Sequence, residues 1–491
     1  MKGPIRHSSQ ASQTHPVRAT GFVARLGSLI LLGGMLLLGV VCMPRPCWPQ
    51  PKPKPLAEGI TLVDVTARMH LSLPALSNPP SAQTLQKPIA PGEYSLEFAR
   101  RVLIPAIGGF VAAGDLDGSG YPDLYVVVPG GLNHFFRNLR NGTFVDKTRE
   151  AGAPGTGSDL FATFADYDHS GNASLFVAGF GGVTVYHNNG DGSFTDVTEK
   201  TGIKRMPGEL ATSALLFDAE GNGTPDLLVT VYTDLNTPPK KPSFLFPNDF
   251  ASARSHLYHN QGDGTFREMN VADSLDENPG RTRKALAADF GHSGRLDLLL
   301  LRDNKPPALF RNKGRGTFED QTWQAGGENW KYAYVDGQLS DFDHDGKLDI
   351  ALWSTIGNEV LINQGEGKFE QEKTFPIVFA ANRPFGFHGA TADLKADGYD
   401  DLLVVDNNGE WHYIANHRGK FALAQLKLES AGTQAKGEGG KSVFPDLSCL
   451  VPVRVQKSGK VVLIGVGRDG QLVAFEARQQ QKTPTRPPTQ N

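Results

Sequence analysis

Six short loops along this chain carry oxygen-bearing side chains at spacings that could bind metal ions. The fullest, DFDHDGKLD, runs from Asp341 to Asp349, with carboxylates at loop positions 1, 3, 5 and 9 and a glycine at position 6. Carboxylates that converge on one point repel one another unless a cation neutralises them. Since Ca²⁺ takes about six to eight oxygens in a flexible geometry, the pattern favours Ca²⁺ over the stricter Mg²⁺.

The other loops keep this pattern to different degrees. Positions 1, 3, 5 and 9 would supply side-chain oxygens, and position 7 a main-chain carbonyl from Tyr121 or Lys347. The predicted ligands are Asp115, Asp117, Ser119, Tyr121 and Asp123 in the first loop; Asp166, Asp168 and Ser170 in the second; Asp218, Glu220, Asn222 and Asp226 in the third; and Asp341, Asp343, Asp345, Lys347 and Asp349 in the fifth.

Three loops depart from the pattern. Ser174 replaces the last acid of the second loop, Gly291 stands at position 3 of the fourth, and Lys395 stands at position 3 of the sixth. The ammonium of Lys395 could take the place of an ion. We therefore expect three good Ca²⁺ sites, one marginal site and two doubtful ones. The alternative is that Asp, Ser, Asn and Gly only form tight turns here.

A repeated element must position these loops. Their first aspartates are separated by 51, 52, 71, 52 and 52 residues, which gives a period of about 52 with one insertion. Each loop lies between two apolar runs, and a strand ending in Asn, a Gly-rich turn and a strand opening on Phe follow, as in VYHNNGDGSFTDVT at 185–198. Four short strands per unit form one antiparallel meander, and such meanders build a β-propeller.

A seventh unit without acidic ligands follows the sixth. Residues 451–466 align with the sixth unit when Gly459 is set against Gly398, which places Arg454 where the first aspartate stands. This unit has predicted strands near 451–456, 460–466 and 471–477 but no fourth strand. The segment TLVDVT at 61–66 resembles the missing strand. We expect it to close the last blade of an all-β, seven-bladed propeller of four-stranded antiparallel blades over 60–477; alternatively, it packs elsewhere.

The N-terminus predicts export. Residues 26–43 carry no charge and follow a basic segment, 1–25, which is typical of a signal anchor. We expect this anchor to hold the propeller outside the cytoplasm, in the periplasm or at the cell surface. A cleaved signal, or lipidation at Cys42, is the alternative. A Pro-rich linker at 44–59 would follow the anchor, and 478–491 would form a disordered tail.

The net charge of −3 hides an asymmetry that bears on partners. Residues 1–54 hold seven Lys or Arg and residues 478–491 hold three, and neither segment contains an acid. Removing these ten positive charges leaves −13 for residues 55–477. A strongly negative propeller argues against nucleic acid as a partner.

The repeated phrase D-x-D-x-D-G-x-x-D-L, followed by N-x-G-D-G-x-F-x-D-V-T, resembles the FG-GAP or VCBS repeat. This repeat forms the propellers of integrin α-chains and occurs in bacterial proteins similar to the ASPIC and UnbV group. The resemblance covers about 60–477. It implies a Ca²⁺-stabilised propeller outside the cytoplasm that serves recognition or adhesion. It also implies ligand roles for the loops 115–123, 218–226 and 341–349, matching the assignment made from the residues alone.

An insertion between the third and fourth units is the predicted partner-binding segment. The period is stretched over 232–256, which contains Lys240, Lys241, Phe244, Phe246 and Phe250. Exposed aromatic side chains beside lysines could anchor a protein or a glycan. The alternative is that this loop folds over the propeller's own surface. A second irregular stretch, 77–93, is predicted to be a linker.

The sequence contains no HExxH, GxSxG or CxxCH motif, so we do not expect an enzyme. The leading prediction is a membrane-tethered, calcium-dependent binding module for a protein or glycan. Two alternatives are a scaffold or assembly factor of an envelope complex, and an enzyme that acts on polysaccharide.

Overall fold

The computed structural model describes residues 56–73, 104–128, 130–237, 251–269, 275, 280–330, 333–354, 357–372, 389–406, 409–429, 445–457 and 459–480. The chain divides into two compact units, Met1–Lys52 and Pro53–Asn491, and all described residues belong to the second. The predicted anchor at 26–43 and the irregular stretch at 77–93 lie outside the described residues. Within the described part of the chain, every helix is too short or too polar to cross a membrane.

The described residues confirm the prediction of an all-β fold built from four-stranded antiparallel sheets. The first sheet has the order β2 (Phe110–Gly114), β3 (Asp123–Val127), β4 (His134–Asn138) and β5 (Phe144–Asp146). The helices described are α2 (Ile104–Ile107), α3 (Thr148–Ala151) and the 3₁₀ turn η4 (Gly327–Asn329).

Four further sheets repeat this order of strands. They consist of β6 (Asp159–Ala165), β7 (Ser174–Gly179), β8 (Gly182–Asn188) and β9 (Phe194–Asp196); β10 (Glu209–Phe217), β11 (Asp226–Asp234), β12 (His256–Asn260) and β13 (Phe266–Glu268); β14 (Thr282–Ala288), β15 (Asp297–Arg302), β16 (Ala308–Gly314) and β17 (Thr317–Asp320); and β18 (Tyr334–Ser340), β19 (Asp349–Ser354), β20 (Asn358–Gly365) and β21 (Lys368–Gln371).

The remaining described strands form one eight-stranded sheet. Its order is β22 (Gly389–Ala392), β23 (Asp401–Val405), β24 (Trp411–Asn416), β25 (Phe421–Glu429), β1 (Leu56–Asp64), β28 (Leu472–Gln479), β27 (Val462–Gly467) and β26 (Leu447–Val453). β1 pairs with β28 in the antiparallel sense, as expected for a strand that completes the last unit, and with β25 in the parallel sense.

Several boundaries differ from the prediction. β1 begins inside the predicted linker 44–59, and β28 runs two residues into the predicted tail 478–491. The first strand of the last unit was expected at 451–456, but β26 ends at Val453. The next residue, Arg454, stands at loop position 1, where every repeat leaves its first strand. β1 begins at Leu56 and ends at Asp64, whose carboxylate accepts hydrogen bonds from the main-chain N–H (2.9 Å) and hydroxyl (2.7 Å) of Thr66. This Asx turn ends the strand before the expected limit of residue 66.

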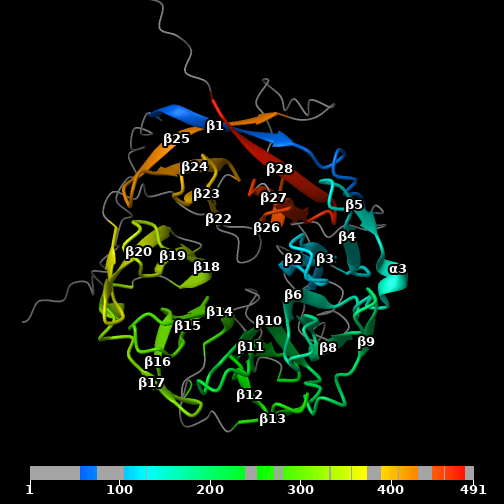
Figure 1. Cartoon of the computed structure of the whole chain (residues 1–491). Helices are drawn as coiled ribbons and strands as arrows, with labels where there is room; N and C mark the ends of the chain where they lie inside the picture. The colour runs from blue at the N-terminus through cyan, green and yellow to red at the C-terminus, as the bar shows by residue number, and fades with distance from the viewer. Residues whose placement is uncertain are drawn as a thin grey trace, which may run out of the picture. The chain divides into compact units, whose positions relative to one another are not determined.

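Within this unit, the first strands of the repeats surround a common centre (Figure 1). Each of β2, β6, β10, β14, β18, β22 and β26 contacts the next, and β26 contacts β2. The second strands are buried along their length, as in β3, where every residue from Asp123 to Val127 is buried. Such a strand, covered on both faces, reads as a continuous apolar run, which matches the sequence.

Neighbouring repeats interlock through the residue at loop position 2. Its side chain packs against the phenylalanine that opens the fourth strand of the next repeat. Ring centroids are 5.4 Å apart for Phe290 and Phe369, and 5.5 Å for Phe342 and Phe421. Edge-to-face aromatic pairs at this distance contribute about 0.5–1.5 kcal/mol beyond the area that they bury.

In six repeats, a buried asparagine at or near the end of the third strand (the lock asparagine) connects neighbouring repeats by a hydrogen bond, which we did not predict. Its Nδ2 donates to the main-chain carbonyl at loop position 2 of the preceding repeat. The donor and acceptor pairs are Asn188 and Leu116, Asn260 and Tyr167, Asn312 and Ala219, Asn363 and Phe290, Asn416 and Phe342, and, between the first and last repeats, Asn138 and Val455.

The junction between the sixth and seventh repeats is built differently. By pairing register, Ala477 in β28 stands where Asn416 stands in β24, so this lock is lost. The parallel pairing of β1 with β25 connects the two repeats instead, in register from Gly59 opposite Gln425 to Val63 opposite Glu429. This backbone ladder, together with a hydrogen bond from Nε2 of Gln479 to the Lys395 carbonyl (2.5 Å), takes the place of the asparagine at this junction.

His256 should make stability depend on pH near neutrality. Its Nε2 lies 2.9 Å from Glu209 and its Nδ1 2.8 Å from Glu268. Burial alone would lower the pKa of His256, but hydrogen bonds and attraction from both glutamates raise it above its usual value. The imidazolium therefore stabilises the fold fully below about pH 6.5, and this stabilisation disappears as pH rises through the raised pKa.

We expect His256→Gln to remove this pH dependence. Between pH 6 and pH 8 the wild type should lose roughly 0.5–1 kcal/mol of unfolding free energy relative to the variant, the range of partly exposed ion pairs. Urea unfolding at both pH values measures the difference. Parallel pH profiles for the two proteins would contradict the assignment.

Candidate metal centre

Each acidic loop joins the first and second strands of its repeat and is shaped by its first aspartate. In the first loop, Asp115 accepts hydrogen bonds from the main-chain N–H groups of Ser119 (2.9 Å) and Gly120 (2.7 Å). Gly120 has φ 80°, a left-handed conformation that glycine adopts readily. The same pair of bonds is made by Asp166, Asp218, Asp289, Asp341 and Asp393. The first aspartate therefore has a structural role in all six loops.

The last aspartate of each loop is buried at the start of the second strand. Asp349 is 0% exposed and accepts main-chain hydrogen bonds from Asn363 (2.8 Å) and Phe342 (2.9 Å). Burial raises the pKa of Asp349 to about 7, and the nearby Asp343 and Asp345 add to the effect. Burial likewise raises the pKa of Asp123 to about 6. A cation beside these groups would offset the cost of holding them ionised.

Asp226, Asp297 and Asp401 occupy the same buried place in the third, fourth and sixth loops. Burial raises the pKa of each of the three. In the second loop Ser174 takes this place, and its Oγ accepts the Asn188 N–H at 3.2 Å. The serine therefore preserves the hydrogen bond of the missing acid but supplies no charge.

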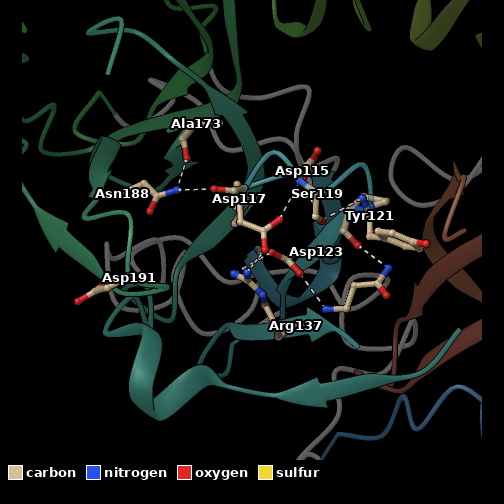
Figure 2. Close-up of polar contacts among 12 residues, drawn as sticks. Asp115, Asp117, Ser119, Tyr121, Asp123, Arg137, Ala173, Asn188 and Asp191 are labelled. Atoms are coloured by element: carbon tan, nitrogen blue, oxygen red, sulfur yellow. Dashed lines mark hydrogen bonds and ion pairs between the residues drawn. The ribbon is translucent and has the colours of Figure 1, made fainter. Parts of the chain in front are cut away.

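The first loop contains a cation of its own. Figure 2 shows the guanidinium of Arg137, from β4, directed at the carboxylates of Asp117 and Asp123. Arg137 contacts Asp117 and lies 3.3 Å from Asp123, while Arg140 lies 2.9 Å from Asp117. Partial burial opposes ionisation of Asp117, but the hydrogen bond from Ser119 and the two arginines lower its pKa to about 2. The guanidinium thus brings positive charge to carboxylates predicted to bind Ca²⁺.

Most of the other loops contain a similar basic side chain. The residue immediately before the lock asparagine supplies it in four repeats, as Arg137, His187, His259 and Arg311. The ring nitrogen of His187 lies 3.1 Å from Asp168, and that of His259 lies 3.2 Å from Asp226 and 3.5 Å from Glu220. Arg311 lies 3.6 Å from Asp297.

In the sixth loop, Lys395 supplies the cation from loop position 3. Its ammonium lies 2.9 Å from Asp401 and 3.1 Å from Asp397, and it donates to the main-chain carbonyl of Asn416 at 2.7 Å. The structure thus places this ammonium among the carboxylates of its loop, in the manner expected from the sequence.

The fifth loop differs because Ile362 stands where four other third strands carry a basic residue, and Asp343 stands at the loop position of Lys395. Carboxylate oxygens of Asp341, Asp343 and Asp345 lie within 4.8 Å of one another. Lys347 forms an ion pair with Asp345. An all-oxygen donor set with a buried fourth acid, Asp349, fits Ca²⁺. Among the described residues, this loop is the strongest candidate for a metal site.

A cavity of about 300 Å³ lies beside the first loop, between the first and second repeats. Asp117 and Arg137 line it from one repeat, and Asn188 and Asp191 from the next. The residues proposed to bind a partner, Lys240, Lys241, Phe244, Phe246 and Phe250, lie outside the described residues.

Comparisons with known proteins support the repeat assignment. The FG-GAP-like repeat matches at residues 115–177, 166–229, 289–352 and 341–404. Cartilage acidic protein 1 from Xenopus tropicalis is 24% identical over 185 residues, covering 36% of this chain and 28% of that protein. The chain therefore spans less than a third of that relative's length.

Two lectins are among the solved structures that this chain resembles. The lectin of Agrocybe aegerita that recognises terminal N-acetylglucosamine has 20% identity and a TM-score of 0.44, covering 64% of this chain and 79% of that one. BP39L lectin from Burkholderia pseudomallei has 10% identity and a TM-score of 0.46, covering 77% and 99%. Because both scores are below 0.5, the fold assignment rests on the repeats and the strand order.

Proposed function

We propose that this repeat β-propeller protein, which carries FG-GAP-like repeats, is a calcium-binding module that recognises a protein or a glycan. The observation that carries the proposal is the fifth loop. There, three carboxylates lie within 4.8 Å of one another and no basic residue precedes the lock asparagine. An ion at this loop would brace the junction of β18 and β19. It would also hold Phe342, at loop position 2, against the next repeat.

The proposed blade count is seven. Five four-stranded sheets each count as one blade, and the eight-stranded sheet counts as two. Its halves are β22 to β25 and, with β1 as the outermost strand, β26 to β28. The closed series of contacts among first strands supports this division.

The proposed location is outside the cytoplasm, with the propeller tethered to a membrane through residues 26–43. The support is the charge-free segment after a basic lead in the sequence. Ca²⁺ affinities of extracellular modules are commonly weak, about 10⁻⁴–10⁻³ M, which suits loops with few charges.

Binding rather than catalysis is the proposed activity, because the geometry that recurs in the repeats accounts for contacts between repeats and for the proposed ion site. The insertion between β11 and β12 is the proposed recognition element. Its described ends are fixed, since Thr233 pairs with Ser252 and the hydroxyl of Thr233 donates to the Ala251 carbonyl at 2.7 Å. The intervening residues can therefore be replaced by a short Gly-Ser linker without moving these ends.

We expect replacement of residues 238–250 to abolish capture of a partner from an envelope extract, while the Tm stays within about 2 °C of the wild type. Capture by the intact protein should weaken when EDTA is added. Affinity purification followed by mass spectrometry, with melting curves of both proteins, measures these effects. Equal capture by the two proteins would contradict the role of the insertion, and polymer breakdown by the intact protein would show an enzyme.

A further inference from the structure

A hairpin in the sixth repeat brings together one imidazole and two carboxylates. It joins β23 to β24, and the main-chain N–H of Asp406 donates to the carbonyl of Glu410 at 2.9 Å. Val404 pairs with His412 on the facing strand. Because alternate residues of a strand lie on the same face, Glu410 and His412 share a face, which Asp406 joins from the opposite strand.

The donor atoms of these residues are already close to one another. Nε2 of His412 lies 3.0 Å from Oδ2 of Asp406, and one donor atom from each of the three residues lies within 4.8 Å of the others. Around a tetrahedral ion with bonds of about 2.0–2.2 Å, neighbouring ligand atoms are about 3.3 Å apart.

We propose that Asp406, Glu410 and His412 form a binding site for a divalent transition metal, of which Zn²⁺ is the representative. A neutral imidazole and two carboxylates are ligands that Zn²⁺ accepts in a set of three, with water in the fourth position. Ca²⁺ prefers oxygen ligands alone and takes more of them. The site therefore differs in ion type from the acidic loops.

The site is also separate from the acidic loop of its own repeat. That loop ends at Asp401, and β23 runs from there to Val405 before the hairpin begins. At about 3.3 Å per residue, a five-residue strand places the two groups of ligands roughly 16 Å apart. The two sites therefore share no ligand, and an ion bound at one does not occupy the other.

The position of the carboxylates relative to the ring distinguishes His412 from His256, which also has two carboxylate neighbours. In His256, Nδ1 faces Glu268 and Nε2 faces Glu209, so the two carboxylates lie on opposite sides of the ring. One ion cannot bind both carboxylates together with a ring nitrogen there. At His412, by contrast, both carboxylates approach the same region.

Zn²⁺ titration of the purified full-length chain tests the proposal. The protein carries no polyhistidine tag, and excess Ca²⁺ is present so that oxygen-only loops are saturated. Isothermal titration calorimetry should detect one tightly bound Zn²⁺ per chain. His412→Ala should weaken this binding by more than about 100-fold and Glu410→Gln by at least tenfold, since even outer-shell changes cost about 10–100-fold.

His134→Ala is the matched control, because His134 faces one carboxylate, Asp146 at 3.0 Å, and should leave Zn²⁺ affinity unchanged. Glu410→Gln changes an exposed side chain and keeps the test independent of folding. No tight Zn²⁺ binding by the wild type, or wild-type affinity in both His412→Ala and Glu410→Gln, would overturn the proposal.

Discussion

Asn138→Ala is expected to lower the free energy of unfolding by about 2–4 kcal/mol, because it removes the polar lock between the first and last repeats. The asparagine is 5% exposed, and its Nδ2 donates to the carbonyls of Pro122 (3.0 Å) and Val455 (3.2 Å). Its Oδ1 accepts the Arg140 N–H at 2.8 Å. Alanine leaves these groups without that partner, at about 1–3 kcal/mol for each buried group left unsatisfied.

Asn141→Ala is the control for this prediction. Asn141 belongs to the same repeat but is exposed, and its Oδ1 accepts hydrogen bonds only from Thr143 among the described contacts, at 3.0 and 2.7 Å. We expect it to cost less than about 1 kcal/mol. Urea unfolding of both variants measures the difference. If the two substitutions have equal effects, the asparagine does not lock the ring.

If Ca²⁺ binds the fifth loop as proposed, Asp343→Asn is expected to abolish most of the resulting stabilisation. A ligand at a hundred times its Kd stabilises the folded state by about 2.7 kcal/mol, so EDTA should lower the Tm of the wild type by several degrees. Asp343 belongs to the group of three close carboxylates in the fifth loop. Removing its charge should leave melting curves with and without Ca²⁺ nearly superimposed.

Asp117→Asn is the matched control, because Arg137 already contacts Asp117 in the first loop. It should keep the Ca²⁺ effect of the wild type.

In the fifth loop, burial raises the pKa of Asp349 to about 7, so protons compete with the ion below that pH. The Ca²⁺-dependent rise in Tm should therefore shrink between pH 8 and pH 6. Equal loss of the Ca²⁺-dependent rise in Tm in Asp343→Asn and Asp117→Asn would contradict the ranking of the fifth loop above the first as a Ca²⁺ site.

The sequence predicts this fold well because its signals are local and repeated. The acidic turn, the strand ending in asparagine and the strand opening on phenylalanine recur at a fixed period, and each corresponds to an observed strand or turn. The pairing of β1 with β28 was also predicted, from the resemblance of 61–66 to a missing strand. The parallel pairing of β1 with β25 was not predicted, because it depends on how the sixth and seventh repeats lie beside each other and not on a local sequence pattern.

The candidate metal sites were less predictable from ligand spacing. All six loops carry aspartate at position 1, but its hydrogen bonds show that it is needed for the turn itself. In four loops the basic residue beside the carboxylates comes from the third strand, about 20 residues further on for Arg137 and Asp117, whereas Lys395 lies in its own loop. The residue before the lock asparagine indicates whether a basic side chain from the third strand lies beside the loop. It is Ile362 in the fifth repeat and Arg137, His187, His259 or Arg311 in the first four. The composition of the loop alone does not show whether such a basic side chain is present.

The pairing of β1 with β28 has a consequence for how the chain is made. The hydroxyl of Thr66 receives a hydrogen bond from Ala474, 408 residues later in the chain. β1 is therefore synthesised long before β28, with which it forms this ladder, and contacts between residues so distant in sequence form slowly. Until then, the edge of β1 that pairs with β28 stays open and can join neighbouring molecules. Nascent chains of this protein should therefore depend on a chaperone until β28 emerges from the ribosome.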